Sequence, residues 1–236
     1  MKKAYINWSG GKDSSLALFY ILQQKEYSVT RLLTSVNAVH NRISMHGVRR
    51  DLLHAQSDSL GIELAITELP EQPAMVEYEN ILNKKVNELK QEGFGFAIFG
   101  DIFLADLRQY REDKLKNAGI TALFPLWKID TRELIHQFIR LGFRAIVVCI
   151  NENYLDKSFC GRIIDEQFID DLPANVDACG ENGEFHTFVF DGPVFRKPVV
   201  FTRGEIVYRE YKAPVITDGN SESIKQYGFW FCDLLI

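Results

Sequence analysis

Apolar and polar residues follow two different periods along the first 150 residues. Short apolar runs typical of buried strands occupy residues 3–8, 29–36, 62–69, 96–100, 120–127 and 144–150. Between them the pattern has the 3.6-residue period of amphipathic helices, at residues 14–24, 48–60, 74–92, 105–118 and 130–141. Strands that alternate with helices of this length are typical of βαβ units. The pattern predicts an α/β fold, with a mostly parallel, doubly wound sheet and helices on both faces.

The pattern changes after residue 150. Helical periodicity nearly disappears, and short strand-like runs follow at residues 184–190, 198–202, 205–211 and 229–236. We therefore expect two parts: an α/β domain over residues 1–150, and a smaller, mainly β portion over residues 151–236. Ligands of open parallel sheets bind at the carboxyl edge of the strands, so we expect the second part to pack there.

Composition and charge narrow the class of protein. The 236 residues carry a formal charge of −5 without a block of like charges, which argues against a broad nucleic-acid footprint. The four cysteines form no C-x-x-C pair, and scattered thiols are typical of a reducing compartment. No apolar run reaches the length of a membrane span. We expect a soluble, cytoplasmic protein that binds no membrane.

The string SGGKDS lies between the first strand and the first helix. Successive backbone N–H groups of such a turn, with the helix dipole, form a site for anions. Lysine adds a positive charge, and the spacing matches neither a Walker A loop nor G-x-G-x-x-G. The simpler interpretation is a capped turn with a solvated lysine. The alternative is a phosphate site built from Ser9, Gly10, Gly11, Lys12, Asp13 and Ser14.

This loop resembles the pyrophosphate loop of the PP-loop ATP pyrophosphatases, in the adenine nucleotide α-hydrolase superfamily. Four further strings, at residues 44–62, 124–127, 154–165 and 183–195, resemble the diphthine–ammonia ligase family. The resemblance covers nearly the whole chain. It implies a Rossmann-like, HUP-type fold and an enzyme that activates a carboxylate with ATP, releases pyrophosphate, and replaces the adenylate with ammonia. It also implies ATP and Mg²⁺ as cofactors.

Two segments depart from the pattern of the diphthine branch. His186 stands where that branch usually has glutamate, and residues 104–108 keep only the arginine of the usual serine, tyrosine-glutamine and arginine. The activation chemistry is expected to survive these changes. The acceptor is either protein-borne diphthine or another carboxylate, as in a bacterial branch.

Several other residues are candidates for the chemistry. Glu181, Glu184 and His186 lie in the glycine-rich string GENGEFHT and are candidate catalytic groups. The two carboxylates are expected to bind magnesium, to position ammonia or to take a proton from ammonium, and His186 is a candidate acid–base group. Arg162 is a candidate clamp for developing phosphoryl charge. Gly100 and Asp101 end a predicted strand at the nucleotide edge, and Asp13 is the candidate metal ligand. The structural alternatives are an exposed acidic turn, a satisfied histidine, an ion pair and a helix cap.

The leading hypothesis is an ATP-dependent amide ligase whose partners are ATP, free ammonia and a carboxylate substrate. A tRNA-modifying PP-loop enzyme of the thiolation or lysidine type is the first alternative, and a non-catalytic nucleotide sensor is the second. Self-association into a homo-oligomer is compatible with this sequence.

Overall fold

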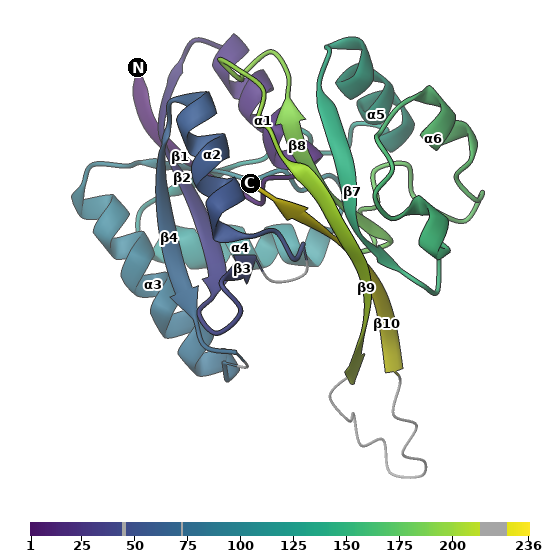
Figure 1. Cartoon of the computed structure of the whole chain (residues 1–236). Helices are drawn as coiled ribbons and strands as arrows, with labels where there is room; N and C mark the ends of the chain where they lie inside the picture. The colour runs from purple at the N-terminus through teal and green to yellow at the C-terminus, as the bar shows by residue number, and fades with distance from the viewer. Residues whose placement is uncertain (44–45, 72, 213–225) are drawn as a thin grey trace.

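The computed structural model describes residues 1–43, 46–71, 73–212 and 226–236 (Figure 1). Five parallel strands form the first sheet in the order β4, β2, β1, β5, β6, and a short β3 pairs antiparallel with the end of β2. The strands are β1 (Lys2–Asn7), β2 (Tyr27–Asn37), β3 (Arg42–Ile43), β4 (Glu63–Leu69), β5 (Phe96–Ile98) and β6 (Thr121–Leu123). The predicted doubly wound α/β sheet is confirmed.

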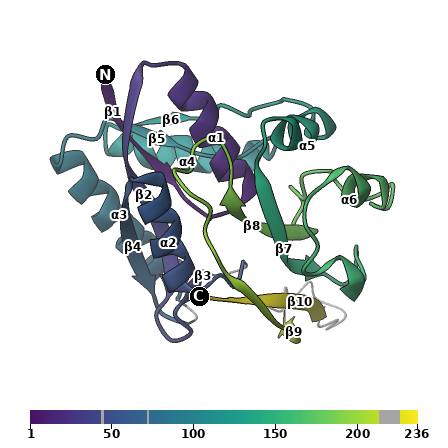
Figure 2. The ribbon, with the colours of Figure 1, turned by 45° about the horizontal axis from the view of Figure 1, so that its top comes forward.

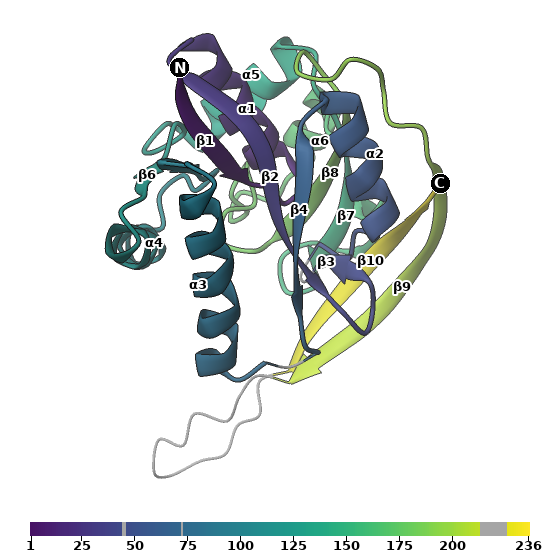
Figure 3. The ribbon, with the colours of Figure 1, turned by 90° about the vertical axis from the view of Figure 1, so that its left-hand side faces the viewer.

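Helices cover both faces of this sheet, as right-handed crossovers require. Figure 3 shows α2 on one side of the strands, and α3 and α4 on the other. Leu89 of α3 and Leu115 of α4 pack with Tyr5 and Phe94 in a small apolar cluster, whereas α1 and α2 contribute to the larger core. These helices are α1 (Lys12–Gln23), α2 (Arg50–Leu60), α3 (Met75–Gln91) and α4 (Ala105–Asn117).

A second, antiparallel sheet packs against the α1 side, with the order β8, β7, β10, β9 (Figure 2). Its strands are β7 (Arg144–Asn151), β8 (Phe185–Asp191), β9 (Thr202–Lys212) and β10 (Gln226–Leu235). The helices of this half are α5 (Thr131–Arg140), a 3₁₀ turn η1 (Lys157–Phe159) and α6 (Glu166–Asp170). Asp130 caps α5 by accepting a hydrogen bond from the Glu133 N–H at 3.0 Å.

The sequence-based expectation was wrong at two strands of this half. The run 144–150 was expected to complete the parallel series, but β7 pairs antiparallel with β8 and β10. A continuously buried strand gives no sign of which partner it will take. The run 198–202 is not a separate strand, because only Thr202 enters a ladder, as the first residue of β9. Pro198 has no N–H to donate to a ladder.

Across the described part of the chain, we find no helix that combines the length and the apolar composition needed to cross a bilayer.

Candidate active site

A cavity of about 790 Å³ opens at the carboxyl ends of β1, β2 and β5. Strands β1 and β5 are neighbours, and the helices that follow them lie on opposite faces of the sheet, so this is a topological switch point where α/β proteins bind ligands. The second sheet closes one side of the cavity through the segment 180–187. Both halves of the chain therefore build the site.

The glycine loop forms the floor of this cavity. Gly10 has φ +77°, a conformation that favours glycine, and Gly11 takes an extended conformation immediately before α1 begins at Lys12. The Ser9 hydroxyl accepts a hydrogen bond from the Gly11 N–H at 3.2 Å, and the Ser14 hydroxyl donates to the Gly11 carbonyl at 3.0 Å. Of the six predicted loop residues, Ser9, Lys12, Asp13 and Ser14 line the cavity.

Lys12 is buried, with 3% of its surface exposed, which excludes the solvated-lysine interpretation. Its ammonium lies 2.8 Å from the Asp13 carboxylate and also donates to the carbonyl of Cys179. Burial alone disfavours the charged amine, but the neighbouring acidic groups, first Asp13 and then Cys179 and Glu181, outweigh that effect and raise the pKa of Lys12. The cavity therefore contains a fixed positive charge beside the loop.

Gly100 and Asp101 follow β5 and both line the cavity. A Cβ on Gly100 would lie 2.9–3.1 Å from backbone atoms of Asp13 and Ser14, so glycine is required there for the close approach of β5 to the start of α1. Asp101 is buried and pairs with the Arg111 guanidinium, whose Nε lies 3.1 Å from Oδ2. Arg111 also donates a hydrogen bond to Oδ1 at 3.2 Å, whereas Oδ2 is buried without a hydrogen-bond partner among the described residues, so the contact of Asp101 with a nucleotide stays a prediction.

Of the two glutamates in the GENGEFHT string, Glu181 is the one that faces the cavity. It lines the cavity, and its carboxylate accepts a hydrogen bond from the Ile102 N–H at 2.7 Å. Burial, together with the neighbouring Asp13 carboxylate, raises the pKa of Glu181 to about 7, although the Ile102 N–H and Lys12 oppose this. A carboxyl group with this pKa can exchange protons near neutral pH.

Glu184 points into its own loop rather than into the cavity. It is 1% exposed, and its carboxylate accepts hydrogen bonds from the N–H groups of Asp177 and Asn182, both at 2.9 Å, and from the Asn182 amide at 3.1 Å. The expectation of an exposed acidic turn is therefore wrong for this residue. Glu184 holds the shape of the loop that presents Glu181.

His186 faces the cavity and stacks on His46, with ring centroids 4.4 Å apart. The two residues come from β8 and from the turn after β3, so only the packing of the two sheets brings them together. His186 is not fully satisfied among the described residues, because its Nε2 is buried without a hydrogen-bond partner. His46 has a backbone hydrogen bond with Thr187, but its Nδ1 is likewise buried without a partner.

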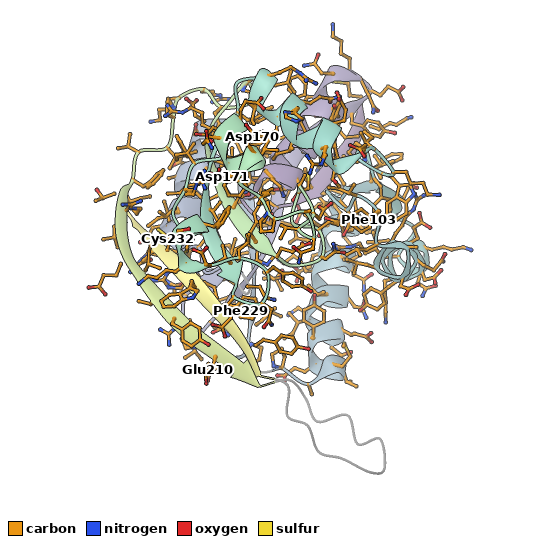
Figure 4. The ribbon with its side chains drawn as sticks, turned by 90° about the vertical axis from the view of Figure 1, so that its right-hand side faces the viewer. Phe103, Asp170, Asp171, Glu210, Phe229 and Cys232 are labelled. Carbon is orange, nitrogen blue, oxygen red and sulfur yellow. The ribbon has the colours of Figure 1, made fainter. Side chains whose placement is uncertain are left out.

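Arg162 lies outside this cavity. Its guanidinium pairs with Asp171 at 2.8 Å and sits over the rings of Phe159 and Phe168. Asp171 lies at the end of α6 and is labelled in Figure 4. The structure therefore supports the ion pair that was the alternative for Arg162, and it does not bring this residue to the other candidates.

Three positioning residues were missed by the sequence reasoning. The fully buried Gln56 amide donates to the carbonyls of Gly10 and Val189 at 3.0 and 2.6 Å, and accepts from the Trp8 indole at 2.8 Å. Thr187 Oγ1 accepts from the Lys12 N–H at 3.0 Å. Asp177 accepts from the N–H groups of Cys179 and Glu181. Gln56 lies in the resemblance string 44–62, the signal that could have found it.

The acidic groups near the loop suit a metal ion carried by a nucleotide. No three His, Cys, Asp or Glu side chains are grouped to hold a metal by themselves within the ranges that the structure describes. Nucleotide-bound Mg²⁺ needs only one or two protein carboxylates beside the phosphates. Asp13 fits this role, because it lines the cavity and its side chain is 31% exposed.

The remainder of the cavity extends between α3 and α4 and is mainly apolar. Leu33 and Phe99 line it on the sheet side and Val86 lines it from α3. Glu79, Tyr110 and Lys114 form a polar edge, with Lys114 Nζ 2.8 Å from Glu79. An apolar lobe next to a loop with a buried lysine can accept a flat, weakly polar ring with a charged tail.

Comparisons with known proteins identify a family for this chain. Residues 1–122 match the family model described as the diphthamide synthase N-terminal domain, and residues 130–217 match the diphthamide synthase C-terminal domain. Diphthine–ammonia ligase of Schizosaccharomyces pombe is 31% identical over 100 residues, which is 41% of this chain and 16% of that protein. The Bos taurus diphthine–ammonia ligase is 30% identical over 132 residues, 53% of this chain and 48% of that protein.

The chain thus spans about half the length, or less, of these curated relatives. A solved structure, the U34-tRNA thiolase NcsA from Methanococcus maripaludis, aligns with a TM-score of 0.37 at 21% identity, over 59% of this chain and 56% of that chain. A likeness of this size carries no argument about activity.

Proposed function

Because the chain belongs to the diphthamide synthase family, we propose that it is an ATP-dependent ligase that activates a carboxylate and amidates it with ammonia. The observation that carries the proposal is the buried Lys12 ammonium, held at the start of α1 beside the glycine loop and facing a large cavity. A fixed cation and a helix N-terminus suit the phosphates of ATP.

In the first half-reaction, an oxygen of the substrate carboxylate attacks the α-phosphorus of ATP. The bond between the α-phosphorus and the bridging oxygen breaks, and acyl-adenylate and pyrophosphate form. Lys12 and the loop N–H groups stabilise the negative charge that builds up on the leaving pyrophosphate. Mg²⁺ would be held by Asp13 and would neutralise phosphate charge when bound.

In the second half-reaction, ammonia attacks the acyl carbon, and AMP leaves. Most ammonia is protonated at neutral pH, so a base must take a proton before or during the attack. Glu181 suits this task, since its raised pKa of about 7 lets the carboxylate accept a proton and return it to solvent. Glu184 does not suit it, because its oxygens are occupied within the loop.

The acceptor is a carboxylate that reaches the α-phosphorus through the open part of the cavity. Diphthine is the acceptor in the names of the relatives, and we propose either diphthine or another carboxylate for this chain. The family resemblance supports the reaction type more directly than the acceptor, because His186 departs from the usual residue of the diphthine branch.

The products of ATP cleavage test the reaction type. The protein is incubated with ATP, Mg²⁺, ¹⁵N-ammonium and a cell extract as the source of acceptor, and the nucleotides are followed by phosphorus NMR. We expect AMP and pyrophosphate, with ¹⁵N in an amidated product found by mass. ADP with orthophosphate would contradict the proposal, and intact ATP would favour the nucleotide-sensor alternative.

A further inference from the structure

Two histidines form a stacked pair on the wall of the cavity that faces the glycine loop. The rings of His46 and His186 are tilted by 31°, and both residues line the cavity. A Cβ on Gly11 would lie 3.3 Å from His46 Cε1, which places this ring directly against the loop. The pair therefore borders the space where the loop would hold phosphate.

One nitrogen of each ring has no partner. His46 Nδ1 and His186 Nε2 are buried and make no hydrogen bond to any residue that the structure describes. A buried polar atom without a partner costs about 1–3 kcal/mol, so such atoms persist mainly where a ligand or an ordered water satisfies them. Two of them together, on one cavity wall, indicate a ligand with several hydrogen-bonding atoms.

The charges around the pair favour an anion over a cation. Lys12 of α1 lies close enough to disfavour protonation of both rings, and Asp13 and Glu181 are the acidic groups beyond it. Burial, with Lys12, lowers the pKa of His46 to about 4 although a backbone hydrogen bond with Thr187 opposes this, and burial and His46 lower the pKa of His186 well below its usual value. Both rings are thus neutral in the free protein. A bound anion would favour the protonated form of the rings, because its negative charge attracts the imidazolium.

A metal ion is the other ligand that two imidazoles could take. The described residues supply no third His, Cys, Asp or Glu ligand grouped with the pair. The observations therefore favour an oxyanion.

We propose that His46 and His186 form the second wall of the phosphate site, and that pyrophosphate bound on the glycine loop brings a proton from solvent onto the pair. The imidazolium N–H groups then donate to phosphate oxygens opposite Lys12. This proposal for the two histidines rests on the proposed function in one respect, namely that the glycine loop binds the phosphates of ATP or pyrophosphate. Protonation of the pair makes the affinity for pyrophosphate depend on pH. Loss of the proton would weaken the binding of pyrophosphate and favour its release.

The protonation state of the pair can be measured directly by NMR. The full chain, with its five histidines labelled with ¹³C and ¹⁵N, is titrated between pH 5.5 and 8 with and without inorganic pyrophosphate. His46→Asn and His186→Gln assign the signals and retain a polar atom near each unpartnered nitrogen. We expect neither ring to titrate between pH 5.5 and 8 in the free protein, and at least one ring to titrate within this range when pyrophosphate is bound.

Exposed His40, which pairs with Glu71, serves as the internal control and should not respond. Pyrophosphate that binds without changing the titration of either ring would overturn the histidine proposal and leave the proposed ligase intact. Pyrophosphate that does not bind at all would contradict the loop assignment and thus the proposed function.

Affinity provides a second readout. Wild type should bind pyrophosphate more tightly at pH 6 than the His46→Asn/His186→Gln double variant, by about 10-fold, the scale of one charge-assisted hydrogen bond. The difference should shrink at pH 8, where the pair loses its proton. Pyrophosphate itself also changes protonation between pH 6 and 8, but this change is the same for wild type and the variant. An affinity ratio that is equal at both pH values would therefore overturn the proposed coupling between pyrophosphate binding and protonation of the pair. If the double variant is unfolded by circular dichroism, the two single variants replace it.

Discussion

At the residue scale, Lys12 combines burial with a positive charge, and its position depends on contacts from both halves of the chain. Its backbone N–H donates to Thr187, and its ammonium reaches Asp13 and the Cys179 carbonyl. A lysine so held needs no reorganisation when charge develops on a leaving pyrophosphate, which is the condition for efficient electrostatic catalysis.

Lys12→Ala should therefore lower the rate of ATP cleavage by about 10²–10³-fold, the usual effect of losing one charge-stabilising donor. AMP release by phosphorus NMR measures it. Lys84→Ala, on the exposed side of α3, is the matched control and should keep the wild-type rate. A folded Lys12→Ala protein with unchanged turnover would show that the loop does not hold the leaving group.

Glu181 makes a prediction that does not depend on knowing the acceptor. In the folded protein its pKa is about 7, above the ordinary 4.5, so folding disfavours the ionised carboxylate. The free energy of unfolding therefore falls as pH rises from about 4.5 through 7. Glu181→Gln keeps an oxygen for the Ile102 N–H and never ionises. We expect this variant to exceed wild type in urea stability at pH 8 and to match it near pH 4.

The same substitution should remove any pH inflection near 7 from the amidation rate, because glutamine cannot accept the proton. Glu205→Gln, on the exposed edge strand β9, provides the control in both assays. Equal stability of wild type and Glu181→Gln at pH 8 would show that the carboxyl group titrates normally.

At the element scale, the loop 177–184 between α6 and β8 is held from within by two carboxylates. Asp177 accepts from the N–H groups of Cys179 and Glu181, and the Thr131 hydroxyl ties Asp177 to the start of α5. Glu184 accepts from Asp177 and Asn182 at the other end. These bonds aim Glu181 into the cavity.

Glu184→Gln replaces one acceptor oxygen by a donor that faces another N–H group. Hydrogen bonds to a buried charge contribute about 1.5–3 kcal/mol, so we expect a loss of about 2–3 kcal/mol in the free energy of unfolding. ATP cleavage and amidation should fall together, because the whole loop loses its shape. A stable variant that cleaves ATP but fails to amidate would instead indicate a direct role for Glu184 in the ammonia step.

At the scale of the whole molecule, the two sheets are joined at more than the active site. Asp233 of β10 binds two arginines of the first half: Arg49 Nη2 at 2.5 Å and Arg42 Nη1 at 2.8 Å. Figure 1 shows β9 and β10 reaching from the second sheet toward β3 and α2. This ion-pair cluster fixes the C-terminal hairpin against the turn that carries His46.

Burial by itself would raise the pKa of Asp233, but the hydrogen bonds from Arg49 and Arg42 outweigh it and lower the value to about 2. The carboxylate thus adds stability above its ordinary pKa of 3.8, and that contribution is lost as pH falls from about 4 to 2. After allowance for solvent screening, the shift corresponds to about 1–2 kcal/mol.

Asp233→Asn should be less stable than wild type by this amount at pH 7, measured by urea unfolding, and the two proteins should converge near pH 2. Asp106→Asn in the first turn of α4, an exposed position away from the hairpin, is the comparison variant. A constant difference across the whole pH range would indicate lost packing instead of a lost ion pair.

Short stretches of the sequence were sufficient to predict the first sheet, its helices and the glycine loop. Strand and helix periods extend over neighbouring residues, and the SGGKDS turn is built by six consecutive residues, so each feature is present in a short stretch of sequence. The glycine loop and the placement of Gly100 and Asp101 at the strand edge follow from these short stretches together with the rule that parallel strands bring their carboxyl ends together.

Only the tertiary structure decided how distant residues face one another. β7 reads as one more buried strand, yet its partners β8 and β10 come from later in the chain. Glu181 and Glu184 are three residues apart, but one carboxylate faces the cavity and the other the interior of its loop. His46 and His186 meet only because β8 packs against the glycine loop. A sequence pattern records which residues are apolar or polar, whereas the direction and the partner of each polar side chain depend on segments that folding brings together.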